Sequence, residues 1–198
     1  GDTLRVRAGD RRWEGLRLGL GGDYQGDNAA CALAALVELG DRGFPVADDH
    51  VREGLRRAKW PGRLEWHPGS PAFLFDAAHN ASGCETLARY LDGLDVTGRV
   101  VLLFGAMRDK DHRRMLAAFD GRVDRRVYAA PSVVRSERPT RLARIRAGTE
   151  ARSVRDAVAR ARRAAGPDGL VVVAGSIFLV SEARALVKNV RTDPPIPL

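Results

Sequence analysis

Three short apolar runs constrain the fold of the larger part of the chain. They are AFLF (72–75), RVVLLFG (99–105) and GLVVVAGS (169–176). A continuously apolar run of this length is typical of a parallel strand that is covered on both faces. Segments with helical periodicity separate these runs, so that strands and helices alternate from Gly62 onward. This alternation predicts an α/β fold with a Rossmann-like, mostly parallel sheet.

Further elements complete this predicted domain. We expect strands at 64–67 and 126–130, and helices at 80–91, 110–119, 140–146, 153–165 and 177–187. Ser153 and Asp156 have the spacing of a capping box at the start of the fourth helix. The proline-rich tail (192–198) is expected to be frayed.

Residues 1–61 follow a different pattern. The first twenty residues predict two short strands, and 28–39 predict a helix that is apolar nearly all round and therefore buried. A second helix is expected after Asp48, ending before Pro61. The segment contains no glycine-rich phosphate loop, and it reads as the end of another domain. We therefore place a domain boundary between 1–61 and 62–198.

The net charge of +8 is concentrated in one segment. Residues 121–163 hold thirteen arginines against four acidic residues. Two readings are open, a solvated arginine-rich face and a surface for an anionic partner. The chain shows no zinc spacing, recognition-helix pattern or interleaved aromatics, so we expect no nucleic-acid partner.

Composition also predicts the cellular setting. No run approaches the ~18–20 uncharged residues of a membrane span, and the first residues show no signal-peptide pattern. The two cysteines, Cys31 and Cys84, are expected to be reduced. A cytoplasmic protein without membrane contact is expected.

Polar residues follow the three apolar runs. Asp76, His79 and Asn80 follow the first, Asp109-Lys110-Asp111 the second, and Gly175-Ser176 the third. Because parallel strands bind ligands at their carboxyl ends, these groups are candidates for a site. Each is equally compatible with a helix N-cap. The four histidines show no paired ligand spacing, so no metal ligand is predicted in this chain.

Several motifs together resemble the folylpolyglutamate synthase/dihydrofolate synthase branch of the Mur ligase family. They are GGDYQGDNAA (21–30), WPGRLE (60–65), DAAHN (76–80), DKD (109–111) and GS (175–176). WPGRLE about a dozen residues before D-x-A-H-N is the specific part. The sequence departs from the family pattern at Ala77 (usually Gly), Ala81 (usually Pro) and Tyr24 (commonly His).

The resemblance implies that 1–61 is the C-terminal fragment of a central ATP-binding domain and 62–198 a C-terminal domain that contacts ATP and glutamate. The phosphate-binding loop and the Mg²⁺ ligands are then expected N-terminal of Gly1, and these 198 residues alone are expected to be inactive. Glutamate would be added to dihydropteroate or folates by an ATP-dependent C–N ligase, through an acyl phosphate. Another Mur-family amino-acid ligase, or a stand-alone binding module with an arginine-rich face, remains an alternative.

The resemblance also implies roles for individual residues. Arg63, Asp76 and His79 would be the catalytic and ATP-contacting residues, with Arg63 on the phosphates. Asn28 would meet the adenine or ribose of ATP. Lys110 and Ser176 would hold the incoming glutamate. ATP and Mg²⁺ are the expected cofactors, the substrates are small molecules, and the protein is expected to be a monomer.

Overall fold

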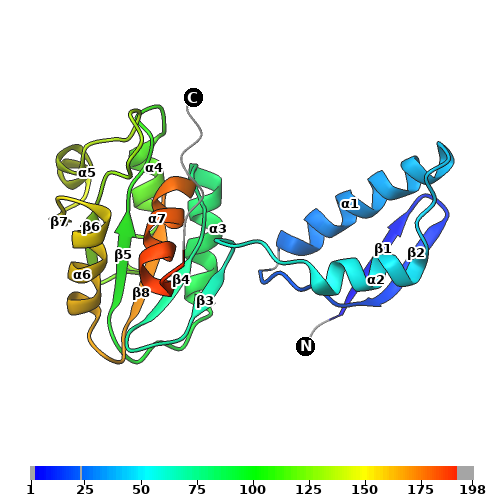
Figure 1. The fold of residues 1–198 in the computed structure, drawn as a ribbon, viewed down its shortest axis with the longest axis horizontal. Helices are drawn as coiled ribbons and strands as arrows, with labels where there is room; N and C mark the ends of the chain where they lie inside the picture. The colour runs from blue at the N-terminus through cyan, green and yellow to red at the C-terminus, as the bar shows by residue number, and fades with distance from the viewer. Residues whose placement is uncertain (1–2, 23, 191–198) are drawn as a thin grey trace. The chain divides into compact units, whose positions relative to one another are not determined.

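A computed structural model describes residues 3–22 and 24–190. Asp23 of the 21–30 motif and the tail expected to fray lie outside the described residues. The chain divides into two compact units, Gly1–Pro61 and Gly62–Leu198 (Figure 1). Each unit has its own core and is described by itself.

The first unit is a β-hairpin accompanied by two helices. Strands β1 (Leu4–Ala8) and β2 (Arg11–Leu16) pair antiparallel, and α1 (Tyr24–Asp41) and α2 (Asp48–Arg57) follow. Alternate residues of β1, Val6 and Ala8, contribute to its core together with Trp13 and Leu16 of β2, which are each 1% exposed. The indole Nε1 of Trp13 donates to Asp48 Oδ1 at 2.8 Å, which ties the start of α2 to the hairpin. The two expected strands and the second helix are confirmed.

Helix α1 corrects one prediction. The sequence predicts that this helix is buried all round, yet its buried residues are only Gln25, Ala29 and Leu33. Cys31 is exposed and Leu39 is 44% exposed. The prediction was wrong because burial depends on what covers a helix. A two-stranded hairpin and one short helix cover a single stripe of an 18-residue helix.

The second unit is a six-stranded sheet with helices on both faces. Its strands are β3 (Glu65–His67), β4 (Ala72–Phe75), β5 (Val100–Phe104), β6 (Arg125–Tyr128), β7 (Thr149–Glu150) and β8 (Leu170–Ala174). Its helices are α3 (Ala81–Asp92), α4 (His112–Ala117), α5 (Pro139–Ile145), α6 (Val154–Ala165) and α7 (Ile177–Lys188). The strand order is β3-β4-β8-β5-β6-β7, with β3 antiparallel to β4 and the other pairs parallel. The predicted α/β, mostly parallel fold is confirmed.

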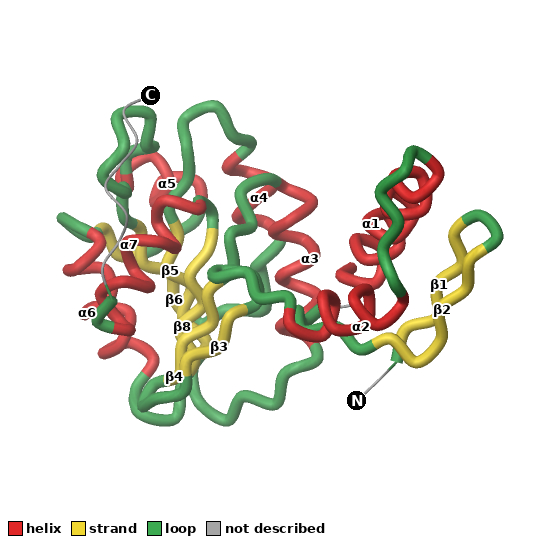
Figure 2. The backbone as a smooth tube through the Cα atoms, turned by 45° about the vertical axis from the view of Figure 1, so that its right-hand side comes forward, coloured by secondary structure: helices red, strands yellow, loops and turns green. Residues whose placement is uncertain are grey.

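The helices form two layers around this sheet. Figure 2 shows α3 and α4 on one side of the strands and α6 and α7 on the other. This division follows from right-handed crossovers, since the chain moves one way along the sheet from β4 to β7 and then turns back to β8. Phe73, Val101 and Val171 belong to the core packed under α6 and α7. Their neighbours along each strand point to the opposite layer, which explains why the strands are apolar on both faces.

Candidate functional site

Three polar segments meet at one edge of the sheet. Strands β4, β8 and β5 are adjacent and parallel, so the residues that follow them lie together, as the sequence predicts. The N–H of Gly175 donates to the carbonyl of Ala78 at 2.8 Å and joins two of these segments. Gly175 has φ +105°, and a Cβ there would lie 2.7 Å from the carbonyl oxygen of Gly105. The close approach of the segments therefore requires glycine at this position.

Asp76 is the buried centre of this edge. It is 3% exposed. Its Oδ2 accepts from the backbone N–H of Leu64 at 3.0 Å, and its Oδ1 accepts from that of Ala78 at 2.9 Å. Burial raises the pKa of Asp76 and outweighs the opposing effect of these hydrogen bonds and of the Arg63 charge. The carboxylate thus joins the loop before β3 to the loop after β4.

The loop at 62–65 is tightly turned. Gly62 has φ +76° and Leu64 has φ +42°, both left-handed conformations that L-residues other than glycine rarely adopt. A Cβ on Gly62 would lie 2.9 Å from Val180 Cγ1. The carbonyl of Gly62 accepts from the N–H of Ala77 at 2.7 Å. The turn therefore rests directly on α7 and on the segment after β4.

Glu65 anchors the same loop from the other side. Its Oε2 accepts from the N–H of Gly62 at 2.8 Å and from Arg184 Nε at 2.7 Å, and its Oε1 accepts from Lys188 Nζ at 2.5 Å. Burial alone would raise the pKa of Glu65, but the hydrogen bonds from Arg184, Lys188 and Gly62 lower it to about 2. Sequence reasoning missed this anchor. Its only local signal is that Arg184 and Lys188 are four residues apart on one helical face.

Arg63 lies between these two anchored positions. In the part of the chain that the structure describes, its guanidinium makes no hydrogen bond or ion pair, although its charge lowers the pKa of nearby Asp76. The backbone on both sides is held by the carboxylates of Asp76 and Glu65. A fixed backbone with an uncommitted guanidinium is the arrangement that a bidentate contact with an oxyanion requires.

The sequence left open whether His79 and Asn80 cap a helix or belong to a site, and the two residues differ in this respect. Asn80 is the N-cap of α3, and its side chain accepts from the N–H of Gly83 at 2.7 Å. His79 is exposed, and its Nδ1 lies 3.0 Å from the carbonyl oxygen of Ala77. Because a carbonyl only accepts, Nδ1 carries the proton in this bond and Nε2 is left for another partner. Asn80 is therefore structural, whereas His79 presents a ring nitrogen to solvent.

Lys110 and Ser176 lie at the ends of the two neighbouring strands. Lys110 Nζ pairs with Asp109 Oδ2 at 2.8 Å, and Asp111 is the N-cap of α4. Ser176 is 3% exposed and is the N-cap of α7, with its Oγ accepting from the N–H of Phe178 at 3.2 Å. The hydroxyl of Ser176 keeps its own proton to donate to a ligand. Asp111 and Ser176 are confirmed as helix N-caps. Helix capping does not explain the presence of Lys110.

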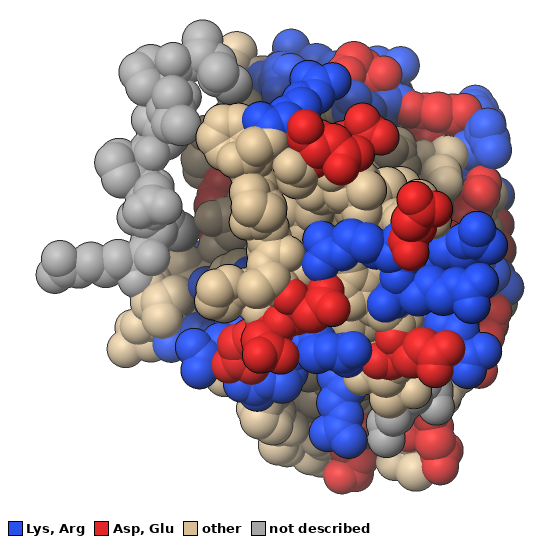
Figure 3. Space-filling model, turned by 90° about the vertical axis from the view of Figure 1, so that its right-hand side faces the viewer, with Lys and Arg blue, Asp and Glu red and all other residues tan. Residues whose placement is uncertain are grey.

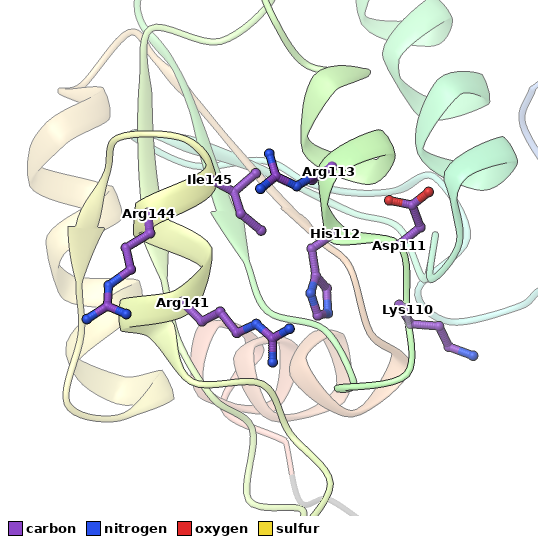
Figure 4. A pocket seen from close by; sticks show the side chains of 7 residues that line it. All are labelled: Lys110, Asp111, His112, Arg113, Arg141, Arg144 and Ile145. Carbon is purple, nitrogen blue, oxygen red and sulfur yellow. The ribbon is translucent and has the colours of Figure 1, made fainter.

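A basic pocket lies between α4 and α5, and we call it the α4–α5 pocket. It is lined by residues 110–113 together with Arg141, Arg144 and Ile145, and its volume is about 320 Å³ (Figure 4). In Figure 4 the side chain of Arg141 extends toward the ring of His112. Arg141 and Arg144 belong to the arginine-rich segment 121–163, but the sequence did not place them in a pocket beside Lys110 and Arg113. Their signal was Arg141 and Arg144 at i, i+3 on one short helix.

Asn28 lies in the first unit, on α1. Its Nδ2 donates to Gln25 Oε1 at 3.0 Å. It borders a mostly apolar hollow of about 160 Å³, whose other lining residues include Leu18, Ala29 and Leu55. A flat apolar group fits beside such a surface, with the Asn28 amide as a polar contact at its rim.

Charges elsewhere on the chain are mixed. Figure 3 shows basic and acidic side chains interspersed on the face in view. Several arginines of 121–163 are paired, for example Arg122 with Asp92 and Arg146 with Asp120. Moreover, α5 packs beside α4 on one face of the sheet, whereas α6 packs beside α7 on the other. The arginine-rich segment therefore does not form one continuous face.

Metal-binding clusters and membrane-spanning helices are both absent from the described residues. Residues 3–22 and 24–190 contain no cluster of three or more His, Cys, Asp or Glu side chains that could hold a metal ion. None of the helices in the same ranges is long and apolar enough to cross a membrane.

Comparison with known families decides the relationship. Residues 62–177 match the model of the Mur ligase glutamate ligase domain. The chain belongs to the Mur ligase family. The match includes the polar edge of the sheet and the two residues that anchor the 62–65 loop, Asp76 and Glu65. The resemblance expected from the motifs is confirmed.

Individual relatives and solved structures show which members of the Mur ligase family the chain is similar to. The chain is 41% identical over 170 residues to a probable bifunctional folylpolyglutamate synthase/dihydropteroate synthase of Halobacterium salinarum, covering 82% of this chain and 20% of that protein. A Mycobacterium tuberculosis folylpolyglutamate synthase solved with ADP and AMPPCP superposes with a TM-score of 0.80 at 30% identity, covering 95% of this chain and 45% of that one. A bifunctional folylpolyglutamate synthase/dihydrofolate synthase with Mn, AMPPNP and L-glutamate bound superposes with a TM-score of 0.77 at 27% identity, covering 92% and 43%. The chain spans less than half the length of these curated relatives and structures.

Proposed function

We propose that this chain is part of an ATP-dependent ligase that adds glutamate to dihydropteroate, to folates or to both. The observation that carries the proposal is the anchored loop, in which Asp76 and Glu65 hold the backbone around the uncommitted guanidinium of Arg63. Support comes from relatives of that description and from a related structure that holds AMPPNP and L-glutamate. The family match to a glutamate ligase domain agrees with it.

The reaction has three steps. A carboxylate oxygen of the substrate attacks the γ-phosphorus of ATP, ADP leaves, and an acyl phosphate forms. The amine of glutamate then attacks the acyl carbon. The C–O bond to phosphate breaks, an amide forms, and the amine loses a proton. Charge on the transferred phosphoryl group is the main demand on the protein, which a fixed guanidinium meets.

The candidate site residues receive roles in this scheme. Arg63 contacts the phosphates. Asp76 positions the Arg63 loop and contacts the nucleotide through the acceptor capacity that its two backbone bonds leave. His79 offers its outward ring nitrogen near the phosphates, and Asn28 meets the adenine or ribose. Each assignment is supported by the geometry of the side chain and by the motif that contains it.

Lys110 and Ser176 hold the incoming glutamate. The ammonium of Lys110 provides the counter-charge for a carboxylate, and it is shared with Asp109 when no ligand is bound. The buried hydroxyl of Ser176 donates to the same substrate while its oxygen caps α7. Both residues follow strands that flank one another, β5 and β8.

The domain assignment is also a proposal. Residues 1–61 are assigned to the end of a central ATP-binding domain and 62–198 to a C-terminal domain. The apolar residues exposed on α1, including Leu39 at 44%, support a larger domain around the first unit. ATP and a divalent metal are the expected reactants, but the described residues offer no cluster that fits the metal. We propose a cytoplasmic monomer acting on small molecules.

The stand-alone binding module is the weaker alternative. It requires one arginine-rich face, whereas the arginines of α5 and α6 lie on opposite layers and several are paired with acids. Salt-sensitive binding of DNA or RNA that depends on 121–163 would favour it. A ligase for a different amino acid is the stronger alternative. The ligation assay separates it from a glutamate ligase by the amino acid that is incorporated.

A ligation assay tests the proposal. The protein that carries these 198 residues is incubated with ATP, Mg²⁺, radiolabelled glutamate and either dihydropteroate or a monoglutamyl folate. We expect label in the pteridine product with one ADP released per amide formed. Labelled product from another amino acid but none from glutamate would contradict the glutamate assignment. ADP release that is independent of the acceptor would contradict the ligase.

A further inference from the structure

The α4–α5 pocket carries more positive charge than its own residues neutralise. Four lining side chains are basic, namely Lys110, Arg113, Arg141 and Arg144. Its one acidic lining residue, Asp111, uses Oδ1 to cap α4 by accepting from the N–H of Arg114. Across the ranges 3–22 and 24–190, Arg113 and Arg144 have no acidic partner within ion-pair distance. The pocket is therefore suited to an anion.

A buried acid holds one arm of this pocket in place. Glu137 is 3% exposed, and its Oε2 lies 3.4 Å from Arg141 Nη1 and 3.8 Å from His112 Nδ1. That oxygen has no hydrogen-bond partner in the described part of the chain. The side chain of Arg141 is nevertheless 68% exposed, so its guanidinium is tethered and still accessible. A tethered side chain loses less conformational freedom when a ligand binds.

The position of the pocket limits its ligand. Lys110 lines it and is also the residue that we place against glutamate. The phosphates of ATP are assigned to Arg63 in a different loop. Lys110 is paired with Asp109 and Arg141 with Glu137, which leaves Arg113 and Arg144 as two cations without an acidic partner among the described residues. Two unpaired guanidinium groups beside an accessible third exceed the single net charge of one glutamate. A chain of glutamyl residues offers several carboxylates at intervals, and guanidinium groups pair with carboxylates through two parallel hydrogen bonds.

We propose that the α4–α5 pocket binds the carboxylates of an oligoglutamate chain carried by the substrate. This inference rests on the proposed function, since only a ligase that meets glutamylated substrates has such a chain at this site. The pocket holds the carboxylates behind the reacting end, while Lys110 and Ser176 hold the incoming residue. Acceptors that carry several glutamates therefore bind more tightly than those with one.

Direct binding tests the proposal without ATP. The 198-residue chain is titrated by calorimetry at constant ionic strength with α- and γ-linked triglutamate, free glutamate and inorganic phosphate. We expect one or both triglutamates to bind at least roughly tenfold more tightly than glutamate or phosphate. Equal affinities for triglutamate and glutamate, or tighter binding of phosphate, would overturn the proposal.

Charge-matched variants separate the pocket from general attraction. Arg113→Gln/Arg141→Gln is expected to weaken triglutamate binding roughly tenfold or more. The control pair is Arg155→Gln/Arg163→Gln on α6, across the sheet, and we expect a change of less than about twofold from loss of the same charge. An equal loss in both pairs would overturn the site. Because Arg141→Gln leaves Glu137 less compensated, thermal unfolding is measured in parallel, and Arg113→Gln alone provides a variant that removes no described interaction.

Different results would contradict the proposed function and the assignment of the α4–α5 pocket. If ligation is absent while triglutamate binding depends on Arg113 and Arg141, the proposed function is wrong. If glutamate is ligated but triglutamate does not bind, the pocket assignment is wrong.

Discussion

The carboxylate of Asp76 accepts a hydrogen bond from the backbone N–H of Leu64 at 3.0 Å, twelve residues earlier in the chain. The other oxygen of Asp76 accepts from the N–H of Ala78. One buried acid thus fixes the backbone beside Arg63. Its two hydrogen bonds also account for the presence of a buried acidic residue at the end of β4.

Asp76→Ala is expected to release the loop. Both N–H groups lose their buried acceptor, and each unsatisfied group costs about 1–3 kcal/mol. We expect much faster amide hydrogen exchange at Leu64 and Ala78 and a ligation rate lower by roughly a hundredfold or more. NMR-detected exchange is the decisive measurement. Unchanged exchange with lost activity would mean that Asp76 acts only as a ligand contact.

Glu65→Gln is expected to change the acid stability of the second unit. Glu65 titrates near 4.5 when unfolded and near 2 when folded, so its stabilising effect is complete above about pH 5 and is lost as the pH falls toward 2. The difference is on the order of 3 kcal/mol. Urea unfolding followed by NMR signals of β8 should show a shallower decline between pH 5 and 3 in the variant. The exposed Glu150→Gln serves as the control, and equal slopes in all three proteins would contradict the anchor.

Gly62→Ala is expected to destabilise more than a matched change elsewhere. Gly62 and Gly121 have φ +76° and +77°, yet a Cβ meets Val180 Cγ1 at 2.9 Å only at Gly62, with nothing within 4 Å at Gly121. Alanine at Gly121 carries the backbone strain alone, about 1–2 kcal/mol. Alanine at Gly62 should cost about 1–3 kcal/mol more. The extra cost should disappear when Val180 is also alanine, and its persistence would contradict a direct contact.

Ser176→Ala separates capping from substrate contact. Loss of an N-cap costs about 0.5–2 kcal/mol, and Ser153→Ala on α6 removes a cap of the same type. Both variants should lose similar stability. The KM for glutamate should rise severalfold in Ser176→Ala and stay unchanged in Ser153→Ala. Equal KM values in both variants would leave Ser176 as a cap alone.

Much of the fold follows from local pattern. Continuous apolar runs predicted β4, β5 and β8, and their parallel pairing brings the three polar segments to one edge. The edge strand β7, Thr149–Glu150, was not predicted because two exposed residues show no periodicity. The capping interpretation is confirmed for Ser176. Its role in the site stays a prediction, and the two are compatible because one hydroxyl can serve both.

The remaining features depend on long-range contacts. Glu65 pairs with Arg184 across 119 residues of sequence, and no local rule links them. The exposure of α1 could not be predicted either, because the apolar pattern of a helix shows what it can bury but not what covers it. The basic pocket likewise needs α4 and α5 to be side by side.

The most direct test of the account is the Arg63→Ala variant of the protein that carries this chain. Its ligation rate and its unfolding are measured beside those of the unaltered protein and of Arg63→Lys. We predict a loss of turnover by roughly a thousandfold with unchanged thermal unfolding. Arg63→Lys should recover little activity, since an ammonium lacks the bidentate contact of a guanidinium. Near-normal turnover of Arg63→Ala would contradict the central claim that the anchored loop presents Arg63 to the transferred phosphate.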